Sequence, residues 1–216
     1  MSIPRVLHVV WVGDEAQRPE DCIRSWSHLN PGFELRVWGN REMAETRWIN
    51  ARHMEAMWNH ELAGVADLMR WEILHRHGGF AIDADGFALR PLDDWLFDCT
   101  MFACWENEIA RPGLIANGYV AAAPGNPLLA RIIDDLRQEA NLTDRMAWQS
   151  TGPLRLTQAF HRYRCGELSV YPSHYFMPEH FTGLRYTGSG RVYARQEWRS
   201  AQRHLATRTR ESLLSI

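Results

Sequence analysis

The chain has 216 residues, of which 45% are hydrophobic and 23% charged, and its formal net charge is -2. This length and balance predict one globular domain with a full hydrophobic core, and they exclude a disordered chain. The chain has no basic surplus, which argues against a nucleic-acid partner. Four scattered cysteines form no CxxC pair, so we expect reduced thiols and no structural zinc.

The segment 5–12 is the first predicted element. Its sequence, RVLHVVWV, is rich in β-branched residues, which is typical of a buried strand. The segment is too short to span a bilayer, and no apolar signal region precedes a small-residue cleavage site. We therefore expect a cytoplasmic protein without a membrane-spanning helix.

Strands and helices alternate along the rest of the chain. Apolar alternation and short apolar runs predict further strands at 33–38, 80–82, 100–105 and 119–123. Helical periodicity and end signals predict helices at 19–26, 61–77, 127–140 and 152–163, with a broken helical pattern from 41 to 60. The alternation indicates an α/β sandwich. We expect a single domain, 1–216, with a helical tail that begins near residue 195.

The helix predicted at 61–77 leads directly to a pair of carboxylates. Its apolar residues fall on one broad amphipathic stripe, and Gly78 and Gly79 end it. The strand at 80–82 then delivers Asp83 and Asp85 into a turn, at the edge where open α/β sheets bind ligands. Two carboxylates so placed can hold one hard cation that bridges to phosphate oxygens. A solvated turn, in which local hydrogen bonds favour Asp, would give the same triplet.

The context of this triplet resembles glycosyltransferase family 32, the DXD-containing sugar transferases. The stretch 66–85 contains the pattern AD-x-x-R-x-x-I-L, followed by GG and then DxD. The opening segment 3–13 and the turn Asn30-Pro31-Gly32 also look similar to the family. The resemblance thus covers residues 3 to about 125.

The resemblance implies a GT-A fold, a nucleotide-sugar-binding α/β sandwich with a mixed central sheet. It also implies a metal-dependent hexosyltransferase that moves a sugar, with retention at the anomeric carbon, from a UDP- or GDP-sugar donor. The cofactor would be Mn²⁺ or Mg²⁺, held by Asp83 and Asp85. The acceptor would be a saccharide or a lipid-linked glycan, as in polysaccharide biosynthesis.

The resemblance further implies roles for individual residues. Trp11 would stack on the base of the donor, although a core Trp at a strand end would fit as well. Asp67 and Arg70 share a helix face and would contact the sugar and diphosphate, or would form a plain ion pair. Asn117 would approach the donor sugar, although Asn-Gly is equally a turn signal.

The carboxy-terminal segment is expected to complete the metal shell. Glu197 would be the third ligand, assisted by Ser200, because a carboxylate oxygen suits Mg²⁺ or Mn²⁺. The alternative is that Glu197 pairs with a neighbouring Arg on a solvated helix. Arg195, Arg199 and Arg203 follow at four-residue spacing. They would bring the protein to anionic lipid at the inner face of a membrane, or would form the solvated face of a helix.

Two other functions fit parts of the sequence. The segment 80–87, FAIDADGF, also resembles the haloacid-dehalogenase-like phosphatases, in which the first Asp is the nucleophile. Those enzymes use a Lys to steady the phospho-intermediate, and this chain has no Lys. The second alternative is a non-catalytic protein that keeps the nucleotide-sugar pocket without turnover.

Overall fold

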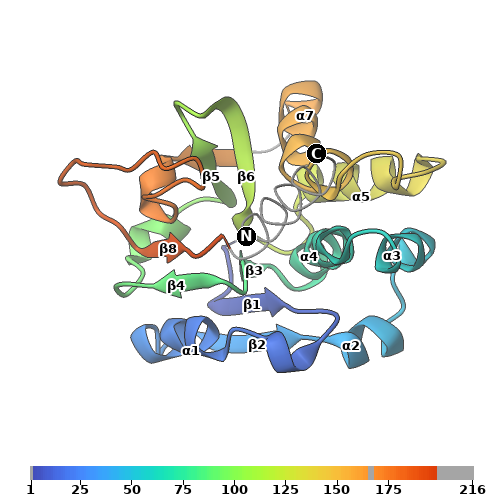
Figure 1. Cartoon of the computed structure of the whole chain (residues 1–216), viewed down its shortest axis with the longest axis horizontal. Helices are drawn as coiled ribbons and strands as arrows, with labels where there is room; N and C mark the ends of the chain where they lie inside the picture. Colours follow the sequence, from blue (N-terminus) through green and yellow to red (C-terminus); the bar gives the residue numbers. More distant parts are fainter. Residues whose placement is uncertain (1, 165–167, 199–216) are drawn as a thin grey trace, which may run out of the picture.

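A mixed six-stranded sheet forms the centre of the computed structural model, which describes residues 2–164 and 168–198 (Figure 1). Its strands, in spatial order, are β2 (Glu34–Trp38), β1 (Val6–Val10), β3 (Gly79–Ile82), β6 (Arg111–Ala122), β5 (Met101–Asn107) and β7 (Leu168–Tyr171). The pairs β1–β2, β1–β3 and β5–β7 are parallel, and β6 is antiparallel to both β3 and β5. The predicted α/β class with a mixed sheet is confirmed.

Two hydrophobic clusters cover the two faces of the sheet. One face packs against the helices drawn to the right in Figure 1, namely α3 (Ala51–Trp58), α4 (Leu62–His77), α5 (Pro127–Gln138) and α7 (Pro153–Tyr163). The other face packs against α1 (Glu20–Leu29) and a small antiparallel ribbon made of β4 (Gly86–Ala88) and β8 (Ala194–Gln196). Shorter helices complete the chain at α2 (Asn40–Glu45) and α6 (Ala147–Ser150), with 3-10 turns at Glu15–Gln17, Asp94–Phe97 and Ser173–Tyr175.

Helix α4 differs from the amphipathic surface helix that its sequence predicts. Nearly every position from Gly64 to Leu74 is buried, including Asp67, Arg70 and Glu72. The helix lies between α3, α5, α6 and the sheet, so it has almost no solvent face. A charged side chain buried in this way needs polar partners inside the protein.

The end of α4 and the start of β3 depend on two glycines. Gly78 has φ 63° and Gly79 has φ 99°, both in the region that favours glycine. A Cβ on Gly79 would stand 2.6 Å from the carbonyl oxygen of Val6 on the neighbouring strand. His8 occupies the same crowded corner, where its Nε2 atom lies 2.9 Å from the Gly78 carbonyl oxygen. The expected role of the two glycines in ending the helix fits this packing.

The carboxy-terminal part of the chain departs from the prediction. Residues Ala194–Gln196 form strand β8, which pairs with β4, whereas the sequence led us to expect a helix from about residue 195. Arg199, Ser200 and Arg203, to which roles were assigned above, lie outside the described residues. Within the described ranges, none of the helices combines the length and apolar character that crossing a bilayer requires.

Candidate active site

The DxD turn lies at the carboxyl end of β3, in the middle of the sheet. The backbone N–H of Asp83 donates to the carbonyl oxygen of Gly118 on β6 at 2.8 Å. The N–H of Gly86 donates to the Asp83 carbonyl oxygen at 2.9 Å and closes the turn. These bonds fix the backbone of Asp83 against β6, so its carboxylate is held beside the polar residues of that strand.

Four predicted site residues form one hydrogen-bonded network. Arg70 donates through Nη2 to Oδ1 of Asp83 at 2.5 Å, and through Nη1 to the carbonyl oxygen of Asn117 at 2.9 Å. Asp67 accepts from Nδ2 of Asn117 at 2.7 Å and from the Thr151 hydroxyl at 3.0 Å. Nη1 of Arg70 also lies 3.3 Å from Oδ1 of Asp67. The structure therefore brings Asp67, Arg70, Asn117 and Asp83 together.

The structure also bears on the alternative interpretations of these residues. Asp67 and Arg70 do form the ion pair considered as the alternative, but it is buried, with the two side chains only 10% and 5% exposed. Asn117 and Gly118 lie inside strand β6 and form no turn. Thr151 is a member that the sequence analysis missed, because it follows α6 and meets Asp67 across 84 residues of chain.

Burial of the Asp67 carboxylate changes its acidity. Removal from water raises the pKa of Asp67 to about 7, although the charge of Arg70 and the bonds from Asn117 and Thr151 act in the opposite direction. A carboxyl group in this position exchanges its proton near neutral pH. Asp67 can therefore accept or donate a hydrogen bond to a ligand hydroxyl, according to its protonation state.

Two glycines make room for the carboxylates of this network. A Cβ on Gly118 would collide with the carboxylate of Asp83, and a Cβ on Gly152 would stand 2.9 Å from Oδ2 of Asp67. Neither glycine has a positive φ, so the requirement is one of space. Glycine at these two positions lets the backbones of β6 and of the α7 start approach the carboxylates.

Gln196 on β8 is the side chain that bridges the two carboxylates of the DxD motif. Its Nε2 atom lies 2.6 Å from Oδ1 of Asp85 and 3.4 Å from Oδ2 of Asp83. Its Oε1 atom accepts from the Tyr119 hydroxyl at 2.7 Å. The sequence analysis missed Gln196, because only the pairing of Gln196 with Gly86 in the β4–β8 ribbon brings it over the turn.

The DxD carboxylates suit a hard divalent cation. One oxygen of Asp83 and one of Asp85 both face the Nε2 atom of Gln196, so the two carboxylates point toward the same place. Oxygen atoms are the ligands that Mg²⁺ and Mn²⁺ prefer. An amide oxygen is also a ligand for such cations, and rotation of the Gln196 amide would present it. Residues 2–164 and 168–198 contain no group of three or more His, Cys, Asp or Glu side chains arranged to bind a metal ion.

Glu197 lies beside the DxD turn, and its carboxylate pairs with an arginine. Its backbone N–H donates to the carbonyl oxygen of Asp85 at 3.1 Å, which keeps it beside the turn. Its carboxylate accepts from Nε of Arg195 at 2.8 Å, which is the ion pair considered as the alternative. The role of Glu197 in metal binding stays a prediction.

Trp11 lies at the same edge of the sheet as the DxD turn. Val9 of β1 pairs with Ile82 of β3, so Trp11 follows β1 at the level where the turn follows β3. Its ring is half-buried and its Nε1 atom donates to the carbonyl oxygen of Asp14 at 3.0 Å. Trp11 is therefore positioned at the edge of the site, where it is half-buried.

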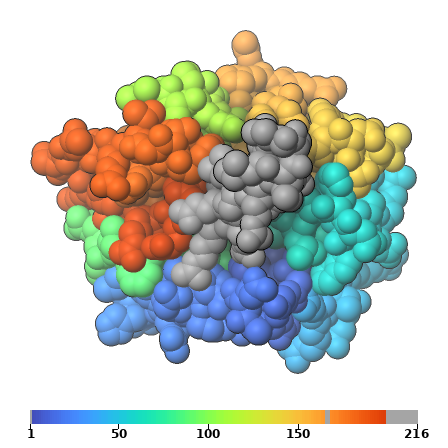
Figure 2. Space-filling model, in the orientation of Figure 1, coloured from blue at the N-terminus to red at the C-terminus, as the bar shows by residue number. Residues whose placement is uncertain are grey.

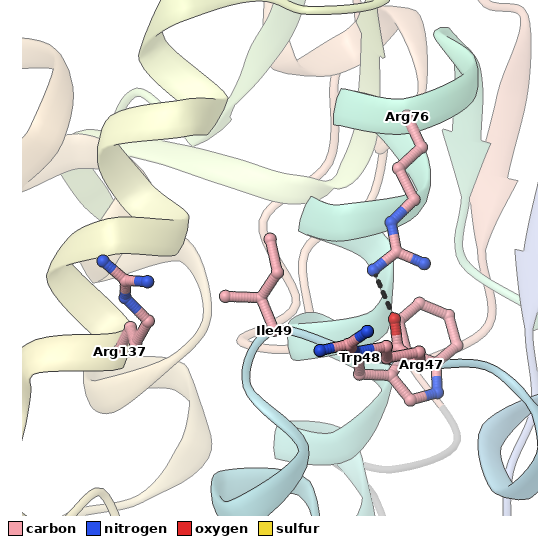
Figure 3. A pocket seen from close by; sticks show the side chains of 5 residues that line it. All are labelled: Arg47, Trp48, Ile49, Arg76 and Arg137. Atoms are coloured by element: carbon pink, nitrogen blue, oxygen red, sulfur yellow. Dashed lines mark hydrogen bonds between the residues drawn. The ribbon is translucent and has the colours of Figure 1, made fainter.

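A separate cavity of about 390 Å³ lies away from the DxD turn. Its walls come from the α2–α3 connection, the end of α4 and the end of α5, as Figure 3 shows. Arg76 donates across it to the carbonyl oxygen of Arg47 at 2.7 Å. The end of α4, which lines this cavity, leads directly into the start of β3, whereas the DxD turn follows the end of β3. The cavity and the DxD turn therefore lie at opposite ends of β3. The cavity contains none of the predicted site residues.

The family described as "Glycosyltransferase sugar-binding region containing DXD motif" matches residues 16–101. Inositol phosphoceramide mannosyltransferase 3 of Schizosaccharomyces pombe is 27% identical over 174 residues, which are 76% of this chain and 46% of the relative. An uncharacterized glycosyltransferase of Acanthamoeba polyphaga mimivirus is 23% identical over 82% of this chain and 73% of its own length. The chain thus spans about half the length of the yeast relative.

Solved structures of glycosyltransferases share the fold. The PaToxG glycosyltransferase superposes with a TM-score of 0.60 at 14% identity, over 74% of this chain and 70% of its own. The UDP-bound glycosyltransferase domain of the YGT toxin gives a TM-score of 0.58 at 9% identity, over 78% and 79%. The phosphatase alternative is wrong, because the matching family model and the fold are those of glycosyltransferases. Residues 16–101 match the sugar-binding region of the DXD-containing glycosyltransferases, and the chain has the GT-A fold of the solved glycosyltransferase structures.

Proposed function

We propose that this protein is a retaining glycosyltransferase that moves a hexose from a nucleotide-sugar donor to a glycan or lipid-linked acceptor. The observation that carries the proposal is the convergence of Arg70, Asp67 and Asn117 on the Asp83 side of the DxD turn. A buried guanidinium beside two acidic groups and an amide offers matched partners to a diphosphate and to sugar hydroxyls.

The donor would lie along the edge of the sheet between Trp11 and the DxD turn. Trp11 offers a ring on which a base can stack, a contact worth roughly 1–3 kcal/mol per base. Asp67, with a pKa near 7 caused by burial, and Asn117 would bind the hydroxyls of the sugar. A solved neighbour of the same fold is a UDP-bound domain, which supports a uridine nucleotide as the first donor to test.

The cation would be Mn²⁺ or Mg²⁺, held by Asp83 and Asp85 and, by prediction, Glu197. When bound, it would offset the negative charge that develops on the departing diphosphate. Arg70 contributes a second positive charge from the protein itself, fixed in place before the donor arrives. The described side chains thus position charge around the diphosphate.

The transfer exchanges one bond of the anomeric carbon for another. The bond from that carbon to the diphosphate oxygen breaks, a bond to the acceptor hydroxyl oxygen forms on the same face, and the hydroxyl proton leaves with the diphosphate. A covalent enzyme intermediate would need a nucleophile on the opposite face, and none of the described side chains is assigned that role. We therefore favour front-face attack, in which the protein mainly orients the two sugars.

The acceptor is proposed by analogy with relatives. Two of them carry the name inositol phosphoceramide mannosyltransferase, which describes transfer of mannose to a lipid-linked acceptor by those proteins. A membrane-bound or lipid-linked acceptor would agree with a protein that works at the inner face of a membrane. That location, and contact through the arginines beyond residue 198, belong to the proposal.

Release of nucleotide from a panel of UDP- and GDP-hexoses, with and without Mn²⁺, tests the proposed function. We expect Mn²⁺-dependent release from at least one donor. Trp11→Ala should raise the dissociation constant of that nucleotide about 10-fold or more, by loss of base stacking, whereas Trp58→Ala, an exposed Trp on α3, should not. Tight nucleotide binding with no turnover of any donor would instead support the non-catalytic alternative.

A further inference from the structure

A row of half-buried aromatic side chains and one arginine lies beside the DxD turn. The guanidinium carbon of Arg111 is 4.5 Å from the ring centre of Trp148 and 5.9 Å from that of Phe181. The rings of Phe181 and Trp198 are 5.3 Å apart. All four side chains keep part of their surface in solvent. We call Arg111, Trp148, Phe181 and Trp198 the aromatic rim.

The two ends of the aromatic rim meet the two sides of the donor site. Trp148 belongs to α6, which is followed directly by Thr151, the partner of Asp67. Trp198 follows Glu197, whose N–H donates to the backbone of Asp85. Figure 2 shows that the orange and red surface of the segment leading to residue 198 adjoins the light green surface of the β5–β6 hairpin, on which Arg111 lies. Both ends of the rim are therefore next in sequence to residues that contact Asp67 or Asp85 of the site already described.

A buried carboxylate lies beneath the aromatic rim. Glu106 is 7% exposed, and its Oε1 atom is 3.4 Å from Nε of Arg111 and 3.4 Å from Nε2 of His180. Both distances are long for hydrogen bonds to a carboxylate, so these contacts leave acceptor capacity on the oxygens. A ligand hydroxyl that reached Glu106 would find a free acceptor beside the donor group of Arg111.

Trp198 is held in a backbone conformation that bulky residues avoid. Its φ is 53°, and Arg164 is the other described residue besides glycine with a positive φ. The indole Nε1 atom donates to the carbonyl oxygen of Glu179 at 2.8 Å, and the ring packs edge-on against His180 and Phe181. These contacts hold Trp198 in a backbone conformation that is unfavourable for a bulky residue. Backbone strain of this kind is concentrated at ligand sites.

We propose that the aromatic rim is the acceptor subsite and that it binds a neutral hexose ring. This inference rests on the proposed function. A hexose has an apolar C–H face, which packs on aromatic rings, and an edge of hydroxyls, which Arg111 and Glu106 can bind as donor and acceptor. The positive charge of Arg111 is matched by Glu106, so the rim favours a neutral ligand over a strongly anionic one. Because Trp148 and Trp198 adjoin residues that contact Asp67 and Asp85, a hexose bound at the rim would present a hydroxyl toward the donor sugar.

Saturation-transfer NMR with methyl α-D-mannopyranoside, -glucopyranoside and -galactopyranoside tests this assignment. We expect signals from the ring protons of at least one probe with the full chain. Trp148→Ala and Phe181→Ala should weaken binding of that probe about 2- to 10-fold, the range of a lost aromatic contact. Trp148→Phe, which keeps an aromatic face, should retain most of the binding. Trp58→Ala, with a Trp 37% exposed on α3, is the matched control.

The outcomes separate this inference from the proposed function. Signals that persist in Trp148→Ala and Phe181→Ala but vanish in Asp67→Asn would assign the sugar to the donor site and overturn the acceptor subsite. Absence of signal from all three probes would also overturn it, and would favour a peptide acceptor. Nucleotide release by the unaltered protein is scored separately, so a protein that turns over donors yet binds no probe refutes only the subsite.

Discussion

Arg70 binds Asp83 directly, so the helix before the DxD turn and the turn itself share one ion pair. The Arg70 side chain is 5% exposed, whereas that of Asp83 is 33% exposed. One oxygen of Asp83 is thus committed to the protein, and the other points toward the Gln196 amide beside Asp85. The two carboxylates of the motif therefore differ in what they do for the fold.

This difference predicts distinct effects for Asp83→Asn and Asp85→Asn. Both should reduce donor turnover by about 100-fold or more, as expected for loss of a group that organises transition-state charge. Asp83→Asn should also lower the free energy of unfolding by about 1–3 kcal/mol, because the buried Arg70 guanidinium loses the nearer of its two carboxylate partners. Urea denaturation of both variants measures this, and equal stabilities would contradict the structural role of Asp83.

Gly118→Ala tests the space available to Asp83. The new Cβ would collide with the Asp83 carboxylate, which would have to turn away from its present position. We expect at least about a tenfold rise in the Mn²⁺ concentration for half-maximal donor turnover, the size seen when a metal ligand loses its orientation. Gly32→Ala is the control, because a Cβ there meets nothing within 4 Å. An unchanged metal titration in Gly118→Ala would show that the carboxylate position is not critical.

Gln196 and Glu197 compete for the role of third metal ligand. If Glu197 is the ligand, Glu197→Gln should shift the Mn²⁺ titration to higher concentration, while the exposed Glu45→Gln should not. If the Gln196 amide completes the shell, Gln196→Ala should give the larger shift, because no oxygen then remains at that position. If the Mn²⁺ titrations of all three variants coincide, neither side chain is the third ligand, and water fills the remaining positions of the metal shell.

His8 should make the fold sensitive to acid. Its Nδ1 atom accepts from the Trp38 indole at 3.1 Å and its Nε2 atom donates to the Gly78 carbonyl oxygen, so the ring is neutral. Burial lowers the pKa of His8 from 6.5 to about 4. Because the folded value is the lower one, the stability due to neutral His8 is present above pH 6.5 and is lost as the pH falls toward 4.

The size of this effect can be measured. Between pH 7 and pH 5 the His8 contribution should cost about 2 kcal/mol of unfolding free energy. His8→Gln keeps an acceptor and a donor without the titration, so its stability should fall less over the same interval. Urea denaturation at the two pH values compares them. The same loss in both proteins would assign the acid sensitivity to other groups.

Much of the fold could be predicted because its elements are locally encoded. The predicted helix at 61–77 is α4 at Leu62–His77, and the predicted strand at 80–82 is β3 at Gly79–Ile82. Asn126 caps α5 by accepting from two backbone N–H groups, which is why the start of that helix was visible in the sequence. Strand β6 begins at Arg111, eight residues before the predicted start. The prediction missed this part because Pro112 and Gly113 are residue types that strands usually lack.

The candidate site could be predicted only in part. Asp67, Arg70 and Asp83 lie within 16 residues of one another, so a local pattern was enough to group them. Thr151 and Gln196 reach the same network from distant segments, and neither is a residue type that signals a site. The burial of α4 on nearly all sides was also hidden, since it depends on the helices that pack around it and not on its own periodicity.

The β4–β8 ribbon has a consequence for the order in which the site is built. Gly86 pairs with Gln196, which lies about 110 residues further along the chain, and the strands between them are paired in the central sheet and not in the ribbon. The ribbon itself consists of two three-residue strands, which form few backbone bonds. The ribbon should therefore open by local unfolding more often than β1 does, and backbone amides of 194–196 should exchange with deuterium faster than those of 6–10. Equal exchange would refute this. Each opening would lift Gln196 off the carboxylates, so we expect local opening of this short ribbon to set the rate at which the cation enters.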